Sequence, residues 1–322
     1  MGYDPSIFKA YDIRGIYPSQ IDEEIAYLIG QGYAQIFEPT KSIVVGRDVR
    51  ISAPKIQKQV IQGLIDAGIN VIDIGMVSTD MFYFAVGYYK YGGGIQVTAS
   101  HNPAEYIGAK LVLENVVPIS EDNGIQDIRH FVEQNKPTKN TKKGKVISKD
   151  VSDDLIKFIK QMIGDHKFKR RKIVYNPNFG YQGIIFEKLV KKLKLPFELI
   201  PLNEKPDGTF PKGRPDPFIP ENRIEFSQLV KSSKSDLGVT WDADADRIFF
   251  CANKGVFVEA YYSTVILIEE ILKNNPKEKI VYDPRYIWGQ IDVIKKKWRD
   301  TNYFADRTFI YKSKNERSQF CF

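Results

Sequence analysis

Hydrophobic and polar residues follow a similar pattern at three places along the chain. At 41–48, 171–177 and 278–285, a charged lead is followed by a run of β-branched residues and then by a polar turn. Each run precedes a stretch in which apolar residues recur at helical spacing. Short apolar runs of this kind predict buried strands, and the recurrence of strand and helix favours α/β domains. We therefore expect tandem mixed-sheet α/β domains.

The stretch that follows the first run is the clearest predicted helix. Ser52 suits the N-cap, Pro54 suits the first turn, and Gly68 suits the position after the C-cap. The apolar side chains of this helix fall on one face, at Ile56, Val60, Ile61, Leu64 and Ile65. The two later helices are predicted from Ile184, Ile185, Leu189 and Val190, and from Ile291, Val293 and Ile294.

The spacing of the three runs predicts the division into domains. Ile43 and Ile173 lie 130 residues apart, and Ile173 and Ile280 lie 107 residues apart, which is too long for a solenoid repeat. A polar, lysine-rich stretch at 135–145 predicts the first boundary, and a softer break near 251–256 predicts the second. The predicted domains are therefore 1–145, 146–254 and 255–322.

Composition narrows the class of protein. The 322 residues are 43% hydrophobic, which is enough for packed domains and argues against disorder over the whole chain. Two cysteines without metal-ligand spacing suit a reducing cytoplasm. The longest apolar stretch, 256–272, is too short and too charged to cross a membrane. The net charge is +7, and the basic residues are densest at 167–172. Such a cluster is more typical of a solvated helix end than of a nucleic-acid patch. We expect a cytoplasmic protein that binds neither membrane nor nucleic acid.

A serine that follows a strand-like run at 94–97 is the first candidate for chemistry. Residues 98–103 read Thr-Ala-Ser-His-Asn-Pro, and Pro103 prevents further strand pairing, so Ser100 is expected to be presented to solvent. Most serines in such positions only satisfy a turn. A hydrolase is disfavoured because the G-x-S-x-G elbow is absent and His101, adjacent in sequence, is poorly placed to deprotonate Ser100.

Three aspartates at alternate positions form the second candidate site. Asp242, Asp244 and Asp246 lie between strand-like runs at 237–241 and 248–251 and are separated by alanines. Small spacers let the backbone curl so that the carboxylates converge on one hard cation. An EF-hand would need Gly at Arg247 and Glu at Asn253, and the chain has neither. An acidic turn without a metal is the alternative.

The serine segment resembles the phosphoserine loop of the α-D-phosphohexomutase family, of the phosphomannomutase/phosphoglucomutase type. The resemblance implies that Ser100 carries a phosphoryl group and that His101 supports its environment. Lys110 matches the general acid/base lysine of the family, although Ile107 stands where the family usually has Asn.

The aspartate segment is similar to the magnesium-binding loop of the same family. The resemblance implies that Asp242, Asp244 and Asp246 hold Mg²⁺ together with a phosphate oxygen on Ser100. Arg247 would then pair with phosphate or orient an aspartate. The metal would neutralise charge on the transferred group, which is the main catalytic need in phosphoryl transfer.

Two further segments extend the resemblance to substrate binding. Residues 8–15 resemble the opening of phosphomannomutase/phosphoglucomutase enzymes, in which Tyr11 and Arg14 would reach the active cleft. Phosphoglucosamine mutases open differently, with Thr-Asp-Gly before Arg-Gly, so mannose or glucose phosphates are the favoured substrates. Arg285 aligns with a basic residue near the substrate, and a surface salt bridge is an equally good interpretation of that residue.

The resemblance implies an isomerase that interconverts hexose 1-phosphate and hexose 6-phosphate as a monomer or weak dimer. Glucose 1,6-bisphosphate or mannose 1,6-bisphosphate would phosphorylate Ser100. The family's sugar-recognition loop and its fourth-domain phosphate loop have no match here, so we expect an incomplete third domain, no fourth domain and slow or no turnover. Phosphoglucosamine mutase, an inactive fragment and a phosphoserine-bearing binding protein are the alternatives.

Overall fold

The computed structural model describes residues 4–137, 140–275 and 289. The chain divides into two compact units, 1–256 and 257–322, and each is described by itself. In the second unit, the main described element is helix α8 (Ala260–Asn274). The first unit contains both sheets except for two residues of the last strand, and all the predicted site residues except Arg285, which lies outside the described residues.

The first sheet has six strands and mixes parallel with antiparallel pairing. Its four parallel strands are ordered β4, β2, β3 and β6, while β5 and then β1 add antiparallel strands beyond β4. A crossover between parallel strands needs an intervening helix, which explains the alternation of strand and helix in this part of the sequence. The bounds are β1 Ile13–Ile16, β2 Ile43–Arg47, β3 Val71–Met76, β4 Gly93–Val97, β5 Tyr106–Leu113 and β6 Val146–Ser148.

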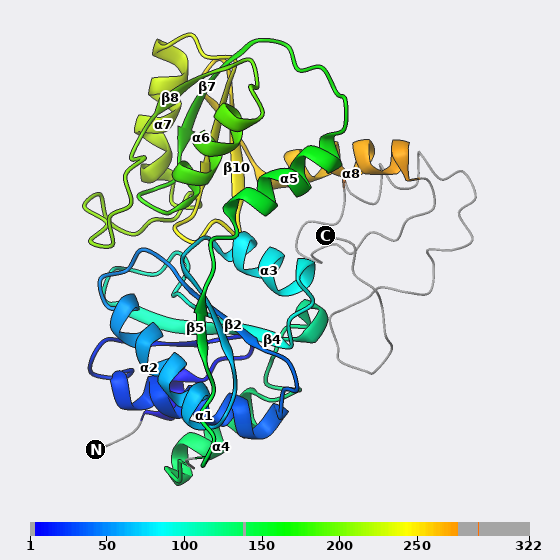
Figure 1. Cartoon of the computed structure of the whole chain (residues 1–322). Helices are drawn as coiled ribbons and strands as arrows, with labels where there is room; N and C mark the ends of the chain where they lie inside the picture. Colours follow the sequence, from blue (N-terminus) through cyan, green and yellow to red (C-terminus); the bar gives the residue numbers. More distant parts are fainter. Residues whose placement is uncertain (1–3, 138–139, 276–288, 290–322) are drawn as a thin grey trace, which may run out of the picture. The chain divides into compact units, whose positions relative to one another are not determined.

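Helices cover both faces of the first sheet. One buried cluster joins α1, α2 and α4 to the sheet, and a second cluster joins α3 and α5 to its other face (Figure 1). Apolar strands buried on both sides are what such a three-layer arrangement requires. The bounds are α1 Glu23–Phe37, α2 Ala53–Asp66, α3 Thr79–Tyr88, α4 Ile125–Gln134 and α5 Ser152–Ile163, with 3-10 turns at Pro5–Ile7 and Glu114–Val116.

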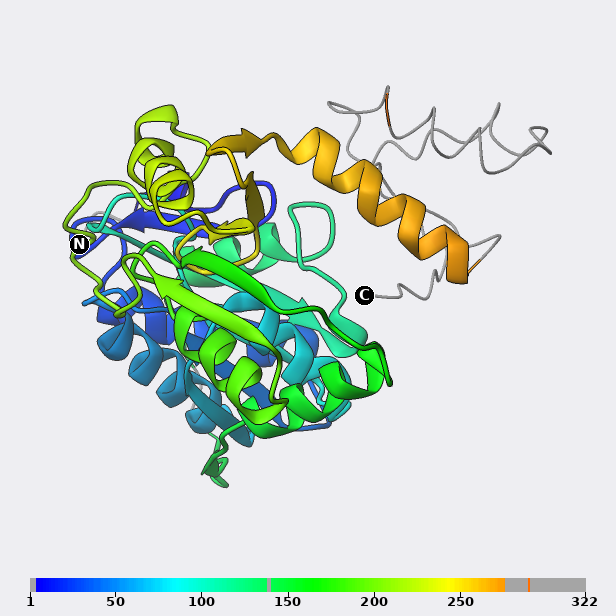
Figure 2. The ribbon, with the colours of Figure 1, turned by 90° about the horizontal axis from the view of Figure 1, so that it is seen from above.

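The second sheet has five strands in the order β11, β10, β9, β7 and β8. The parallel pair β7 and β8 is drawn in green in Figure 2, and β9 pairs with β7 in parallel and with β10 in antiparallel register. The bounds are β7 Arg171–Asn176, β8 Phe197–Pro201, β9 Leu237–Trp241, β10 Ile248–Ala252 and β11 Val256–Val258, with helices α6 Gln182–Lys192 and α7 Pro220–Ser232.

The prediction of tandem mixed-sheet α/β domains is confirmed, and β2, α2, β7 and α6 form where the pattern places them. Ser52 precedes α2 but makes no side-chain capping bond, whereas Gly68 has the left-handed φ of +89° expected after a C-cap. β6 pairs with β3, so the first sheet reaches beyond the predicted boundary at 145. The third run at 278–285 and its predicted helix lie outside the described residues.

No helix among residues 4–137, 140–275 and 289 combines the length and the apolar character that crossing a membrane requires.

Candidate active site

The candidate site forms where two loops from different sheets meet. The serine loop, 98–105, connects β4 to β5, and the aspartate loop, 242–247, connects β9 to β10. Both loops leave the ends of buried strands, so the two sheets fix where each loop begins and ends. Ser100 Oγ donates to Asp242 Oδ2 at 3.1 Å, and the backbone N–H of Thr79 donates to the Asp244 carbonyl at 2.8 Å. Residues 142 positions apart in sequence are therefore in direct contact.

Ser100 is buried, with only 1% of its surface exposed. Its backbone is in the left-handed region at φ +49°, and its N–H donates to Thr98 Oγ1 at 2.9 Å. The expectation that Ser100 is presented to solvent was wrong because the aspartate loop of the second sheet lies over it. Such a left-handed conformation is costly for a residue with a Cβ and is often found at functional sites.

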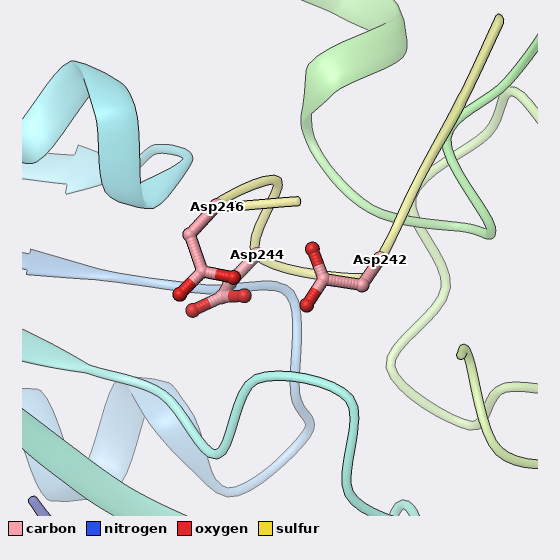
Figure 3. A group of neighbouring side chains, drawn as sticks. All are labelled: Asp242, Asp244 and Asp246. Atoms are coloured by element: carbon pink, nitrogen blue, oxygen red, sulfur yellow. The ribbon is translucent and has the colours of Figure 1, made fainter. Parts of the chain in front are cut away.

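The three aspartates converge as the alternating pattern predicted. One carboxylate oxygen from each of Asp242, Asp244 and Asp246 lies within 4.8 Å of the other two, and Figure 3 shows the three carboxylates facing a common centre. Ala245 adopts a left-handed φ of +60°, which curls the loop. Asp242 and Asp244 are fully buried, while Asp246 is 31% exposed at its side chain. A cation could therefore approach from the side of Asp246.

The aspartate cluster fits a divalent cation. Oδ1 of Asp244 is buried and has no hydrogen-bond partner among the residues that the structure describes. Oδ2 of the same carboxylate accepts from Thr79 Oγ1 at 2.8 Å and from Lys110. A buried carboxylate oxygen without a partner is costly, and a hard cation such as Mg²⁺ with oxygen ligands would remove that cost.

Lys110 balances the charge of this cluster. Its Nζ donates to Asp244 Oδ2 at 2.6 Å and to Asp246 Oδ2 at 2.5 Å. Burial would lower the pKa of Lys110, but the two carboxylates outweigh burial and hold that pKa above its usual value. Burial would likewise raise the pKa of Asp244, but the charge of Lys110 and hydrogen bonds from Lys110 and Thr79 lower it. Lys110 is therefore an ammonium ion beside two carboxylates.

Asp242 has a different electrostatic environment. Burial, followed by the charges of Asp244 and Asp246, raises the pKa of Asp242 well above its usual value. Arg247 lies next to it, with its backbone N–H 3.2 Å from Asp242 Oδ1 and its Nε 4.0 Å from Oδ2. The Arg247 guanidinium also lies 5.6 Å from the centre of the Phe218 ring. The cluster thus has two cationic side chains, Lys110 and Arg247, at its edge.

His101 contacts the candidate nucleophile. Its Nδ1 lies 3.1 Å from Ser100 Oγ, so the expectation that a sequence neighbour is poorly placed for this contact was wrong. Burial and then the positive charge of Arg247 lower the pKa of His101 to about 4. His101 is therefore neutral at physiological pH, and since the one proton of Ser100 Oγ goes to Asp242, the tautomer with a proton on Nδ1 donates to the serine oxygen.

The lowered pKa of His101 predicts a loss of stability in mild acid. The unfolded chain binds a proton at His101 near pH 6.5, whereas the folded chain binds it only near pH 4. Because solvent screens this partly exposed group, the free energy of unfolding should fall by about 1 kcal/mol from it between pH 7 and pH 5. Urea unfolding curves recorded in EDTA at pH 7 and at pH 5 measure this decrease in the free energy of unfolding. The His101→Gln variant should lack this part of the decrease, and His130→Gln, on the exposed face of α4, should keep it. Equal decreases in all three proteins would contradict the prediction.

A pocket of about 490 Å³ adjoins the serine loop. Tyr11 and Arg14 line it together with Lys9, Asp12 and Asn102. Arg14 donates to Asp12 Oδ2 at 2.8 and 2.6 Å and to Asn102 Oδ1 at 2.9 Å, while Tyr11 is 66% exposed. Tyr11 and Arg14 thus face the same pocket, as expected for residues that contact a small polar substrate.

Several side chains at the site were not singled out from the sequence. Thr79 binds Asp244 through its hydroxyl, and the Arg214 Nε donates to the His101 carbonyl at 3.0 Å. Arg50 donates to the serine loop through its guanidinium. Nothing in the local sequence signals the contacts of Thr79 and Arg214, because their partners lie 165 and 113 positions away.

The sequence patterns that define two protein domains match this chain. The pattern for "Phosphoglucomutase/phosphomannomutase, alpha/beta/alpha domain I" matches residues 5–139, and that for domain II of the same family matches 153–255. These are the two halves that supply the serine loop and the aspartate loop. The chain therefore belongs to the phosphoglucomutase/phosphomannomutase family.

Individual relatives agree with this assignment. The phosphomannomutase of Vibrio cholerae is 40% identical over 296 residues, which is 90% of this chain and 64% of that protein. The phosphomannomutase of Escherichia coli K12 is 39% identical and covers 89% of this chain and 64% of its own length. A phosphoglucomutase/phosphomannomutase family protein of Burkholderia thailandensis has a similar structure, with a TM-score of 0.84 at 30% identity over 92% of this chain and 65% of that one. The chain thus spans slightly less than two thirds of these relatives.

Proposed function

We propose that the protein is a hexose-phosphate mutase, an isomerase that interconverts hexose 1-phosphate and hexose 6-phosphate through a phosphoserine at Ser100. The contact of Ser100 Oγ with Asp242, in a cluster of three converging carboxylates, is the observation that carries this proposal. A phosphoryl group on that oxygen would lie next to the cluster, where a divalent cation could neutralise its charge. Family membership supports the same conclusion.

In the proposed reaction, Ser100 donates its phosphoryl group to the free hydroxyl of a hexose monophosphate. The bisphosphorylated sugar then reorients within the site and returns its other phosphoryl group to Ser100. Bound Mg²⁺ would supply charge neutralisation at the transferred group, and Asp242, Asp244 and Asp246 would hold it. The burial of Ser100 would limit attack by water on the phosphoserine.

Three basic side chains have proposed roles around this serine. Lys110, held as an ammonium ion by two carboxylates, would give a proton to the oxygen left on Ser100 and be reprotonated by the proton that the attacking sugar hydroxyl loses, and the return step would run the same exchange backwards. His101 would orient the serine hydroxyl through its Nδ1, and Arg247 would orient Asp242 or pair with phosphate.

Arg14 and Tyr11 are proposed to bind the substrate. Both line the pocket beside the serine loop, and the Arg14 guanidinium already binds Asn102 of that loop. A guanidinium matches the geometry of a phosphate group. A substrate-binding role for Arg285, which lies outside the described residues, stays a prediction.

We propose mannose or glucose phosphates as substrates because the relatives above are named phosphomannomutases or phosphoglucomutase/phosphomannomutase proteins. Glucose 1,6-bisphosphate or mannose 1,6-bisphosphate would phosphorylate Ser100. A cytoplasmic location, a monomer or weak dimer, and the lack of nucleic-acid and membrane partners stay predictions.

Discharge of the phosphoserine tests the proposed substrate class. The chain, phosphorylated with glucose 1,6-bisphosphate and freed of excess reagent, is mixed with Mg²⁺ and one hexose monophosphate. Loss of protein-bound phosphate, followed by intact mass, should be at least about tenfold faster with mannose 1-phosphate or glucose 1-phosphate than with glucosamine 1-phosphate. Fastest discharge by glucosamine 1-phosphate would contradict the proposed substrate. This measurement follows a single phosphoryl transfer and therefore depends on fewer steps than the full reaction cycle does.

A further inference from the structure

Arg50 is one of the largest fully buried side chains in the described part of the chain. It lies three residues beyond the end of β2, and no part of its side chain is exposed to solvent. A buried guanidinium is very costly unless its charge is paired and its N–H groups are bound. The contacts of Arg50 should therefore show what holds it in the interior.

The Arg50 guanidinium binds one carboxylate and four backbone carbonyls. Its Nε lies 3.1 Å from Asp48 Oδ2, which pairs its charge. Its Nη2 donates to the carbonyls of Ser100 at 2.8 Å and Asn102 at 2.7 Å. Its Nη1 donates to the carbonyl of Tyr106 at 3.0 Å and to that of Pro103. All five N–H groups of a guanidinium are thus used, and four of them bind residues 100–106.

The serine loop is held at other points as well, by Ser100 N–H on Thr98 Oγ1, by Arg14 on Asn102 and by Arg214 on the His101 carbonyl, but each of these bonds fixes a single position. Within it, Asn102 N–H donates to the Ala99 carbonyl at 3.0 Å, and Tyr106 N–H donates to the Pro103 carbonyl at 3.1 Å. Ser100 holds a left-handed backbone, which the loop must stabilise against relaxation. Four carbonyls that point at one buried fork restrict the backbone from Ser100 to Tyr106.

Arg50 also contacts the second sheet's long loop. Residue 50 forms an isolated parallel bridge with Gly208, and the Phe210 ring centre lies 5.1 Å from the guanidinium carbon. A Cβ on Gly208 would lie only 2.3 Å from the Val49 carbonyl, so this close approach requires glycine. The loop at 206–211 therefore packs on the arginine that holds the serine loop.

We propose that Arg50 is the positioning residue of the serine loop, and that its guanidinium holds Ser100 Oγ where it meets Asp242. Asp48 keeps the guanidinium in place and also accepts from Thr98 Oγ1 at 2.8 Å, at the start of the same loop. The inference deepens the proposed function, because it concerns the serine that would carry the phosphoryl group.

Arg50→Lys tests this role because it keeps a positive charge but loses the planar fork. Phosphorylation of Ser100 by glucose 1,6-bisphosphate should slow by about 100-fold, as expected when a reacting group is misplaced by about 1 Å. Mg²⁺ affinity, measured by calorimetry, should change less than about threefold, because Arg50 makes no contact with the three aspartates. The matched control is Arg170→Lys, which removes an exposed guanidinium just before β7 and should leave both values unchanged.

Hydrogen exchange separates this proposal from the proposed function, because it needs no chemistry. Arg50→Lys should speed exchange in peptides that cover 98–106, while peptides of α1 and β7 stay unchanged. Unchanged exchange at 98–106, or a uniform increase across the chain, would overturn the positioning role. If wild-type protein takes up no phosphate, the proposed function fails and the exchange result still decides the role of Arg50.

A milder variant covers the case in which Arg50→Lys does not fold. Asp48→Asn keeps the shape of the carboxylate and removes the charge that pairs Arg50. It should raise exchange at 98–106 and slow phosphorylation by about tenfold. Wild-type exchange and wild-type phosphorylation in Asp48→Asn would overturn the proposal.

Discussion

The Ser100→Ala variant should take up no phosphate from glucose 1,6-bisphosphate in the presence of Mg²⁺. Ser100 Oγ is the hydroxyl that lies 3.1 Å from Asp242 in the carboxylate cluster, and alanine removes that oxygen without adding volume. Ser100 is buried, and the smaller alanine side chain fits the same space, so the surrounding loops should stay in place. Uptake of radiolabelled phosphate, measured after gel filtration, should fall to the background of protein without Mg²⁺.

The control for this prediction is Ser148→Ala, which removes a hydroxyl from the exposed edge strand β6. It should take up phosphate at the wild-type rate. Phosphate uptake by Ser100→Ala that equals wild type would mean that another residue carries the phosphoryl group, and the proposed mechanism would be wrong.

The Asp244→Asn variant should lose Mg²⁺ affinity by at least about 100-fold. Replacing a ligand should cost no less than the 10- to 100-fold that altering a ligand's hydrogen-bonded support costs. Asp244 is fully buried, and it is the member of the cluster whose Oδ1 has no partner within the described ranges. Asparagine keeps the shape but removes the charge, which also weakens the pairing with Lys110. Calorimetric titration with Mg²⁺ measures the change.

Asp127→Asn is the matched control, because Asp127 lies in the first turn of α4 and is exposed. It should bind Mg²⁺ as the wild type does. Equal affinity in wild type and Asp244→Asn would show that the three carboxylates do not form the cation site, and the acidic turn without a metal would then be the better interpretation.

The individual elements of both sheets were predictable because their patterns are local. The strand-like runs at 94–97, 237–241 and 248–251 became β4, β9 and β10 with shifts of one residue or less. The convergence of the three aspartates was also predictable, since residues at alternate positions of one short loop cannot lie far apart.

The burial of Ser100 was not predictable from its own segment. The loop that covers it comes from the other sheet, so no pattern near Ser100 reports it. The role of Arg50 was hidden for a related reason: its partners are backbone carbonyls, which every residue has and which leave no signature in side-chain identity. Edge strand β6 was missed because a three-residue strand with exposed side chains has no apolar pattern.

The charges at the site explain why the loops must come together. Three carboxylates within 4.8 Å repel one another, and the Lys110 ammonium offsets only part of that repulsion. β5 supplies Lys110 and the neighbouring loop supplies Ser100, whereas the second sheet supplies the carboxylates. Separating the two sheets would leave Lys110 without its two carboxylates and the aspartates with Arg247 alone, so the attraction between Lys110 and the aspartates favours the assembled site.

Mapping the phosphorylated residue tests the central claim most directly. The wild-type chain is incubated with glucose 1,6-bisphosphate, with Mg²⁺ or with EDTA, and its peptides are sequenced by tandem mass spectrometry. The account predicts one phosphoryl group, on Ser100, that appears with Mg²⁺ and not with EDTA. Phosphate on a different residue, or none under either condition while the protein is folded and binds Mg²⁺, would contradict the claim that Ser100 and the three aspartates form a phosphoryl-transfer site.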